Sequence, residues 1–86
     1  EIHYQKRMPA PLSELRPGQV AEIVSIDCER PIARRLMEMG LLPGTSVRMV
    51  RVAPLRDPLE LRLRDYSLSV RRSDAARISV LAREPA

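Results

Sequence analysis

The clearest pattern in the chain is the alternation of leucine with charged residues over residues 59–64. A period of two residues is that of a β-strand with one buried and one solvated face. Apolar residues alternate in the same way over residues 67–71, and the pair Asp65-Tyr66 between the two segments predicts a hairpin turn. Residues 45–52 and 78–80 have the composition of two further strands. The chain is therefore predicted to consist mainly of short β-strands.

The segment 19–26 is also predicted to be a strand, because its residues are β-branched or small. Its alternation is imperfect: Ala21 and Ile23 share one face, while Val24 and Ile26 share the other. Either both faces are partly buried, or a β-bulge changes the facing in mid-strand.

One helix is expected, beginning at Pro31, because proline is well tolerated at a first helical position. Ile32, Leu36 and Met39 recur at spacings of four and three residues and form one apolar stripe. Gly40 stands where a left-handed cap is expected to end the helix. The stripe predicts that this face of the helix packs on the core.

Two single helical turns are also predicted. One covers residues 12–15, and the other runs through Ala76 with Ser73 as its N-cap. The apolar faces of all elements together define the expected core, which includes Ile23, Leu36, Val47, Leu61, Leu63, Leu68 and Ile78.

The order strand, helix, three strands, short helix, strand favours a mainly β fold, a small closed barrel of about five strands, because closure removes exposed sheet edges. We expect a flexible N-terminal arm over residues 1–10, the barrel over 11–81 and a frayed tail over 82–86.

Composition narrows the fold further. With 86 residues there is room for one domain, and two Tyr without Phe or Trp require an aliphatic core. No apolar run approaches the roughly 18 residues that span a bilayer. One cysteine forms no internal disulfide, so we expect a soluble cytoplasmic protein.

The net charge is +4, from 15 basic and 11 acidic residues. The arginines are scattered and mostly adjacent to acids, as on a solvated surface. This modest charge is no nucleic-acid signature, and we expect no nucleic-acid partner.

The residues give little support to catalysis. His3, the one histidine, lies in the expected arm, so Cys28 lacks an imidazole partner. The carboxylates alternate with arginine or lie in turns, and the three glycines form no phosphate-binding loop. We predict that the chain is not an enzyme and requires no cofactor.

A metal site is the harder case. Asp27, Cys28 and Glu29 are three ligand types in succession, and His3 is a fourth potential ligand. Contiguous residues rarely converge on one ion, and the simpler interpretation is a loop between strand and helix. These four residues are therefore weak candidates for a weakly or interface-bound Fe or Zn ion, and no firm metal site is predicted.

A partner surface is predicted on the helix face opposite the apolar stripe, where Arg34, Arg35 and Glu38 lie, together with the adjoining loop Leu41-Leu42-Pro43. An apolar centre with a charged rim is typical of interfaces. The alternative is that Leu41 and Leu42 fill the end of the barrel and that the arginines only solvate the helix.

Several segments together resemble the FeoA family, over about residues 11–80. The segments that carry the resemblance are Leu12-Ser13-Glu14-Leu15-Arg16-Pro17-Gly18, Arg35-Leu36-Met37-Glu38-Met39-Gly40-Leu41-Leu42-Pro43-Gly44, Val52-Ala53-Pro54-Leu55-Arg56-Asp57-Pro58-Leu59 and Leu68-Ser69-Val70-Arg71. The resemblance implies an SH3-like barrel and a cytosolic role in bacterial ferrous iron uptake. It carries over no catalytic residue.

Two positions depart from the pattern of that family, where glycine is common. Arg56 in the loop must either avoid a positive φ or be strained. Asp65 in the hairpin turn tolerates left-handed geometry better than most residues.

The resemblance implies a non-enzymatic protein that acts by protein–protein interaction on the cytosolic part of the membrane transporter FeoB, as a regulator either of transport or of the transporter's G-protein domain. Such a protein is expected in the cytoplasm, recruited to the inner membrane by its partner, as a monomer or weak homo-oligomer. The alternatives are a metal-binding accessory protein or metal-bridged dimer, and a basic barrel that binds nucleic acid.

Overall fold

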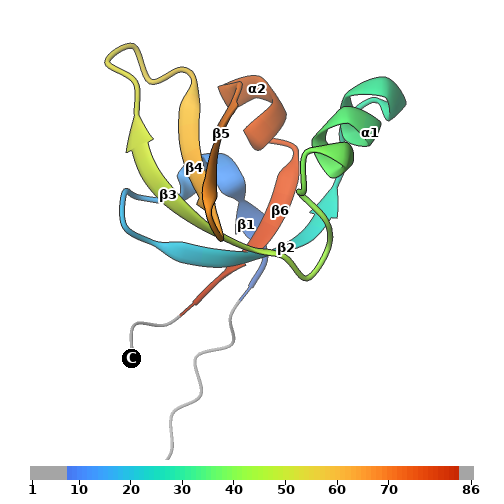
Figure 1. Cartoon of the computed structure of the whole chain (residues 1–86), viewed down its shortest axis with the longest axis horizontal. Coiled ribbons are helices and arrows are strands. Elements are labelled where there is room, and N and C mark those ends of the chain that lie inside the picture. Colours follow the sequence, from blue (N-terminus) through green and yellow to red (C-terminus); the bar gives the residue numbers. More distant parts are fainter. Residues whose placement is uncertain (1–7, 84–86) are drawn as a thin grey trace, which may run out of the picture.

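Six β-strands curl around one aliphatic core in the computed structural model of this chain (Figure 1). The structure describes residues 8–83. The sheet order is β1-β6-β2-β3-β4-β5, and all neighbouring strands are antiparallel. In chain order the elements are β1 (Ala10–Pro11), a 3-10 turn (Leu12–Glu14), β2 (Val20–Ile26), α1 (Arg30–Glu38), β3 (Ser46–Val52), β4 (Leu59–Leu63), β5 (Tyr66–Val70), α2 (Arg72–Ala75) and β6 (Ile78–Ala82). The predicted mainly β barrel, with a helix after its first long strand and a helical turn before its last, is confirmed.

The sheet has one strand more than the five expected. The additional strand is β1, in which Ala10 pairs with Val80 and Pro11 with Ser79. A proline is tolerated there because β1 is an edge strand, where no ladder hydrogen bond needs its missing N–H. The paired region runs from Ala10 to Ala82, while residues 1–7 of the expected arm and 84–86 of the expected tail lie outside the described residues.

Two β-bulges set the facing of the long strands. The register of β2 against β6 shifts between Ile23 and Ser25, and that of β3 against β4 shifts between Met49 and Arg51. Each bulge adds one residue to its strand and so reverses the facing of the residues that follow. This reversal places Ile26 of β2 against the core. Of the two arrangements predicted for this strand, two partly buried faces or a bulge in mid-strand, the structure therefore has the bulge.

Helix α1 ends in a Schellman motif built on Gly40. The N–H of Leu41 donates to the carbonyl of Leu36, and the N–H of Gly40 donates to that of Met37, both at 3.0 Å. Gly40 has φ 106°, as expected for a left-handed cap. The turn carries Leu41 into the core, where it is fully buried, and leaves Met39 40% exposed. The prediction that Met39 completes the inward stripe is therefore wrong, because the helix ends there and Leu41 takes the position.

The N-terminus of α2 is capped from a distant loop. The backbone N–H of Arg72 donates to Oδ1 of Asp57 at 2.9 Å, while Arg71 is the N-cap residue and makes no side-chain cap bond. The prediction that Ser73 is the N-cap is wrong, because the N-cap lies two residues earlier, at Arg71, and Ser73 lies inside α2.

Among the described residues other than glycine, two arginines have a positive φ, and no aspartate does. Arg56 has φ 68° in the loop between β3 and β4, and Arg64 has φ 28° in the turn between β4 and β5. The first is the strained alternative expected for that loop. The second corrects the expectation that Asp65 has the left-handed conformation: β5 already begins at Tyr66, so the turn consists of Arg64 and Asp65.

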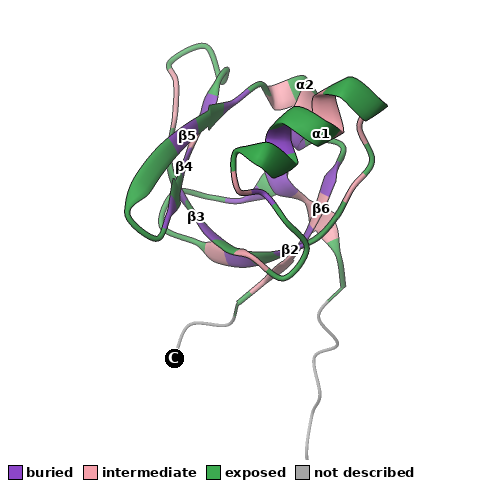
Figure 2. Ribbon diagram, turned by 45° about the vertical axis from the view of Figure 1, so that its right-hand side comes forward, coloured by how far each residue is buried: buried purple, intermediate pink, exposed green. Residues whose placement is uncertain are grey.

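The core is aliphatic throughout. All seven residues predicted for it are buried, and so are Leu12, Leu41, Met49 and Leu59. Figure 2 shows buried and exposed segments along the strands and a large exposed part of α1. The barrel thus holds α1 at its surface with a single face packed inward.

Candidate partner-binding surface

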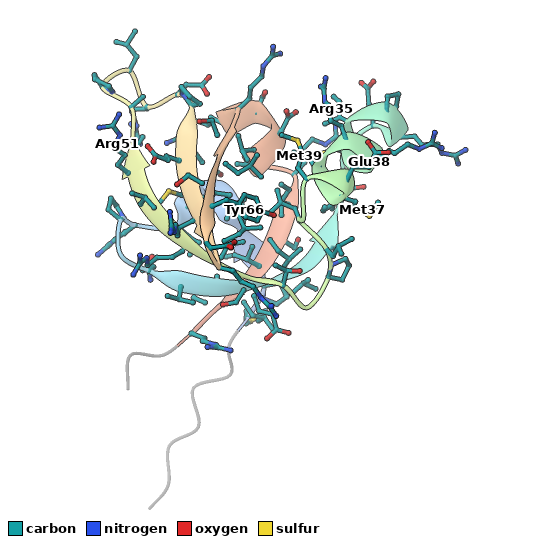
Figure 3. All side chains as sticks on the ribbon, in the orientation of Figure 1. Arg35, Met37, Glu38, Met39, Arg51 and Tyr66 are labelled. Carbon is teal, nitrogen blue, oxygen red and sulfur yellow. The ribbon has the colours of Figure 1, made fainter. Side chains whose placement is uncertain are left out.

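The outer face of α1 carries the three charged residues predicted for a partner surface. Arg34, Arg35 and Glu38 are all exposed, and Figure 3 shows Arg35 and Glu38 projecting from the helix. Within residues 8–83, none of the three side chains forms a hydrogen bond or ion pair. Their charges are therefore not satisfied inside the described part of the chain.

A shallow groove of about 410 Å³ runs along one flank of this face. It is lined by Arg30, Ala33, Arg34, Met37 and Glu38. Met37 is 39% exposed, which places a flexible apolar side chain between two arginines and a glutamate. An unbranched thioether adapts to irregular apolar surfaces, so this arrangement suits contact with another protein.

The loop Leu41-Leu42-Pro43 divides between core and surface. Leu41 is fully buried and belongs to the core, whereas Leu42 is 47% exposed and Pro43 is exposed as well. The interpretation that the leucines fill the end of the barrel therefore applies to Leu41, and the interpretation as a partner surface applies to Leu42. Leu42 and Pro43 are the part that remains available for contact with a partner.

The C-terminal end of α1 is fixed to the sheet by Tyr66. Its hydroxyl group donates a 2.6 Å hydrogen bond to the carbonyl oxygen of Met39 (Figure 3). Together with the Schellman motif, this bond holds the end of the helix and the start of the loop in one position. A surface held in this way loses little conformational entropy on binding.

A second exposed apolar feature lies in the loop of residues 53–58, between β3 and β4. Leu55 is 90% exposed. The side chain of Arg72 supports this loop, because its Nε donates to the carbonyl of Arg56 at 2.6 Å and its Nη1 donates to the carbonyl of Ser13 at 3.4 Å. A groove of about 640 Å³ between this loop and the 3-10 turn is lined in part by Arg16, Arg56 and Arg72.

Of the four residues named as weak metal ligands, the three that the structure describes are not arranged as a metal-binding cluster. Cys28 is half-buried, and its Sγ donates to the carbonyl oxygen of Asp74 at 3.7 Å. Asp27 and Glu29 are exposed, and His3 lies outside the described residues. Across residues 8–83, no group of three or more His, Cys, Asp or Glu residues is arranged to hold a metal ion.

The protonation state of Cys28 follows from the same surroundings. Burial raises the pKa of its thiol above the usual value, the negative charges of Asp74 and Asp27 raise it further, and Arg77 lowers it in part. The thiol therefore stays protonated at neutral pH, and a protonated thiol is a poor nucleophile and a poor metal ligand.

The sequence pattern does not predict the exposed apolar side chains of Met37 and Leu55. Met37 lies on the helix but neither on its apolar stripe nor among the three charged residues of the opposite face, and Leu55 lies in the loop between two strands. The signal for Leu55 was its position between Pro54 and Arg56 outside any periodic segment, which leaves it no strand or helix face to bury.

Comparison with known proteins identifies the relatives of this chain. A family model described as FeoA domain matches residues 10–82. The Fe(2+) transport protein A/Fe(2+) transporter FeoB fusion protein of Porphyromonas gingivalis is 45% identical over 69 residues, which are 80% of this chain and 8% of the relative. This chain therefore corresponds to a small part of that protein.

Solved structures share the fold. The FeoA-like protein of Clostridium acetobutylicum has a TM-score of 0.82 at 33% identity, covering 95% of this chain and 94% of its own. The FeoA of Stenotrophomonas maltophilia complexed with zinc, which is described as an SH3 domain protein, has a TM-score of 0.70 at 36% identity, covering 85% and 88% of the two chains. The expected SH3-like barrel is confirmed. Within residues 8–83, no helix has the length and apolar character needed to cross a membrane.

Proposed function

This chain belongs to the FeoA domain family, and we propose from that membership that it is a non-enzymatic accessory protein of ferrous iron uptake. In this proposal it binds the cytosolic part of a FeoB-type membrane transporter and regulates it. The observation that carries the proposal is the P. gingivalis relative, in which transport protein A and transporter FeoB are parts of one fusion protein. Fusion keeps two interacting modules at a high effective concentration, which is useful when they bind each other.

The outer face of α1, with Leu42 and Pro43, is the proposed contact surface. Its exposed apolar side chains are Met37, Met39 and Leu42, and its charged rim includes Arg34 and Arg35. Apolar residues inside a polar rim are the usual anatomy of an interface, and arginine is among the residues that most often contribute its binding energy. The arginines would face acidic residues of the transporter domain.

The absence of catalysis in this proposal is supported by the chemistry of Cys28. Its raised pKa and its hydrogen bond to the Asp74 carbonyl favour the unreactive thiol form. The chain has a single histidine, His3, so no second imidazole is available as a base. Regulation through binding fits these features better than turnover of a substrate.

Chemical-shift mapping tests the proposed surface. The isotope-labelled chain is titrated with the unlabelled cytosolic domain of its cognate transporter, and amide shifts are recorded residue by residue. We expect the largest shifts over residues 30–43, with small shifts in the loop around Leu55. Saturable shifts centred on Leu55 would assign the contact to the 53–58 loop and contradict the proposal.

A second candidate function, metal binding, is favoured by one observation: the S. maltophilia relative was solved as a complex with zinc. In this chain Asp27, Cys28 and Glu29, with His3 from the same or another chain, would be the ligands. Titration with Zn(II) or Fe(II), followed by light scattering and by the absorbance of the Cys28 thiolate, separates the two functions. Metal-dependent association that Cys28→Ser abolishes would favour a metal-bridged dimer.

A further inference from the structure

Two arginines lie directly opposite each other on the outer face of the sheet. Arg48 of β3 pairs in register with Arg62 of β4, and the same row continues to Val20 on β2 and Ser67 on β5. Both arginines are exposed, and the neighbouring positions Val47, Met49 and Leu61 are buried. The two guanidinium groups therefore extend from the same side of adjacent strands.

The same two strands contain a matched pair for comparison. Arg51 of β3 is opposite Glu60 of β4, and their side chains form an ion pair at 3.2 Å. Like charges directly opposite each other destabilise a sheet, whereas opposite charges stabilise it. The sheet thus has a favourable charge pair at one position and an unfavourable pair only a few residues away.

Nothing within residues 8–83 compensates for the unfavourable pair. The side chains of Arg48 and Arg62 form no hydrogen bond or ion pair there. Glu22 lies opposite Ser46 in the neighbouring row and is exposed, but it forms no ion pair with either arginine. A local rule broken without compensation is expected at functional sites.

A third arginine adds a separate observation. Arg64 has φ 28°, a conformation that L residues other than Asn and Asp rarely adopt, and it lines the same groove as Arg48 and Arg62. The two-residue hairpin turn between β4 and β5 itself favours a positive φ. The turn places the Arg64 side chain in the groove that Arg48 and Arg62 line.

The groove itself indicates the class of ligand. It has a volume of about 480 Å³ and is lined by Val20, Ser46, Val47, Arg48, Arg62 and Arg64, with no acidic residue among them. Three guanidinium groups would be only partly neutralised by one carboxylate, whereas a phosphoryl or pyrophosphoryl group carries two to three negative charges and several acceptor oxygens. Arginine pairs with such groups through two parallel hydrogen bonds.

We propose that this groove is a binding site for a phosphorylated ligand, whose phosphoryl oxygens accept hydrogen bonds from Arg48, Arg62 and Arg64 and whose charge relieves their mutual repulsion. The Ser46 hydroxyl is a further donor in the groove, and Val20 offers an apolar wall. The lining residues come from β2, β3, β4 and the β4–β5 turn, and none of them belongs to the proposed transporter contact on the outer face of α1 with Leu42 and Pro43.

The test uses inorganic pyrophosphate as the probe, titrated into the full chain at low salt and followed by amide chemical shifts. We expect saturable shifts confined to residues around 20, 46–48 and 62–64, and a rise in the unfolding temperature with pyrophosphate. The double variant Arg48→Gln/Arg62→Gln should bind at least tenfold more weakly. The matched variant Arg34→Gln/Arg35→Gln, with the same change in charge on α1, should bind within twofold of the wild type.

A third variant and a second probe complete the test. Arg64→Gly removes one guanidinium group and also relieves the positive φ, so it should fold at least as well as the wild type and yet bind several-fold more weakly. Equal loss of binding in both double variants, or shifts that do not saturate, would overturn the site. Tighter binding of a glutamate-rich peptide than of pyrophosphate in this groove would overturn the phosphate assignment and indicate a protein-docking surface instead.

Discussion

The Tyr66 hydroxyl group occupies the space that a β-carbon on Gly40 would require. The same hydroxyl donates the 2.6 Å hydrogen bond to the carbonyl of Met39. Gly40 is thus needed for two reasons, its φ of 106° and the close approach of the tyrosine. The position of the partner-binding face of α1 therefore depends on this contact between helix end and hairpin.

Replacing Gly40 by alanine should lower the free energy of unfolding by roughly 1.5–3.5 kcal/mol. Roughly 1–2 kcal/mol of this comes from a left-handed residue with a β-carbon, and about 0.5–1.5 kcal/mol comes from the displaced tyrosine hydrogen bond. Gly44→Ala is the matched control, because Gly44 has φ 91° but nothing within 4 Å of its β position. Denaturant unfolding of both variants gives the comparison, and equal losses would show that the Tyr66 contact contributes nothing.

The capping of α2 gives a second pair of variants. Asp57→Ala should cost about 1 kcal/mol, because it removes the acceptor for the Arg72 N–H. Ser73→Ala should change stability by less than about 0.5 kcal/mol, because Ser73 is exposed and makes no cap bond. Thermal unfolding measures both, and a larger loss for Ser73→Ala would contradict the assigned cap.

The opposed arginines on β3 and β4 predict a stabilising substitution. Arg62→Glu places a carboxylate opposite Arg48 and should raise the free energy of unfolding by roughly 0.2–1 kcal/mol at low salt. Screening should reduce the gain in 1 M NaCl. Glu60→Arg is the reverse experiment, since it breaks the Arg51 ion pair and creates a second like-charge pair. Its expected effect is a loss of similar size, and a gain would contradict the register.

The raised pKa of Cys28 predicts slow alkylation. The rate of reaction with iodoacetamide should rise with pH only above the range of an ordinary thiol, and Asp74→Asn should move that rise to lower pH by removing a negative charge. Because the pKa is higher in the folded state, the folded state retains the proton longer. The protonated Cys28 thiol therefore contributes fully to folding stability below the unfolded-state pKa. This contribution is lost as the pH rises from there through the higher folded-state pKa. A rate profile unchanged by Asp74→Asn would exclude the carboxylate as a cause.

Features that depend on nearby residues could be predicted from the sequence. The alternation of leucine and charge in residues 59–63 fixes the facing of β4, and Gly40 marks the end of α1. The exchange of Met39 for Leu41 in the core could not be predicted, because the Schellman motif turns the chain after the helical period has ended. The Asp57 cap joins residues 15 positions apart, which no local pattern contains.

The candidate surfaces also divide into features set by residues nearby in the sequence and features set by contacts between distant residues. The exposure of Arg34, Arg35 and Glu38 follows directly from helical spacing. The pairing of Arg48 with Arg62 depends on the inter-strand register and on the bulge after Met49, which changes which residues of β3 and β4 face each other. Periodicity places both arginines on a solvated face but does not bring them together.

The most direct test of the proposed function is the affinity of a folded charge-reversal variant for the cytosolic domain of the cognate transporter. Arg34→Glu/Arg35→Glu is compared by calorimetric titration with the wild type and with Arg16→Glu/Arg71→Glu, which changes the charge equally at exposed residues outside α1. We expect the α1 variant to bind at least tenfold more weakly, with an unchanged unfolding temperature, and the control to bind within about threefold of the wild type. Wild-type affinity in the folded α1 variant would contradict the assignment of this surface.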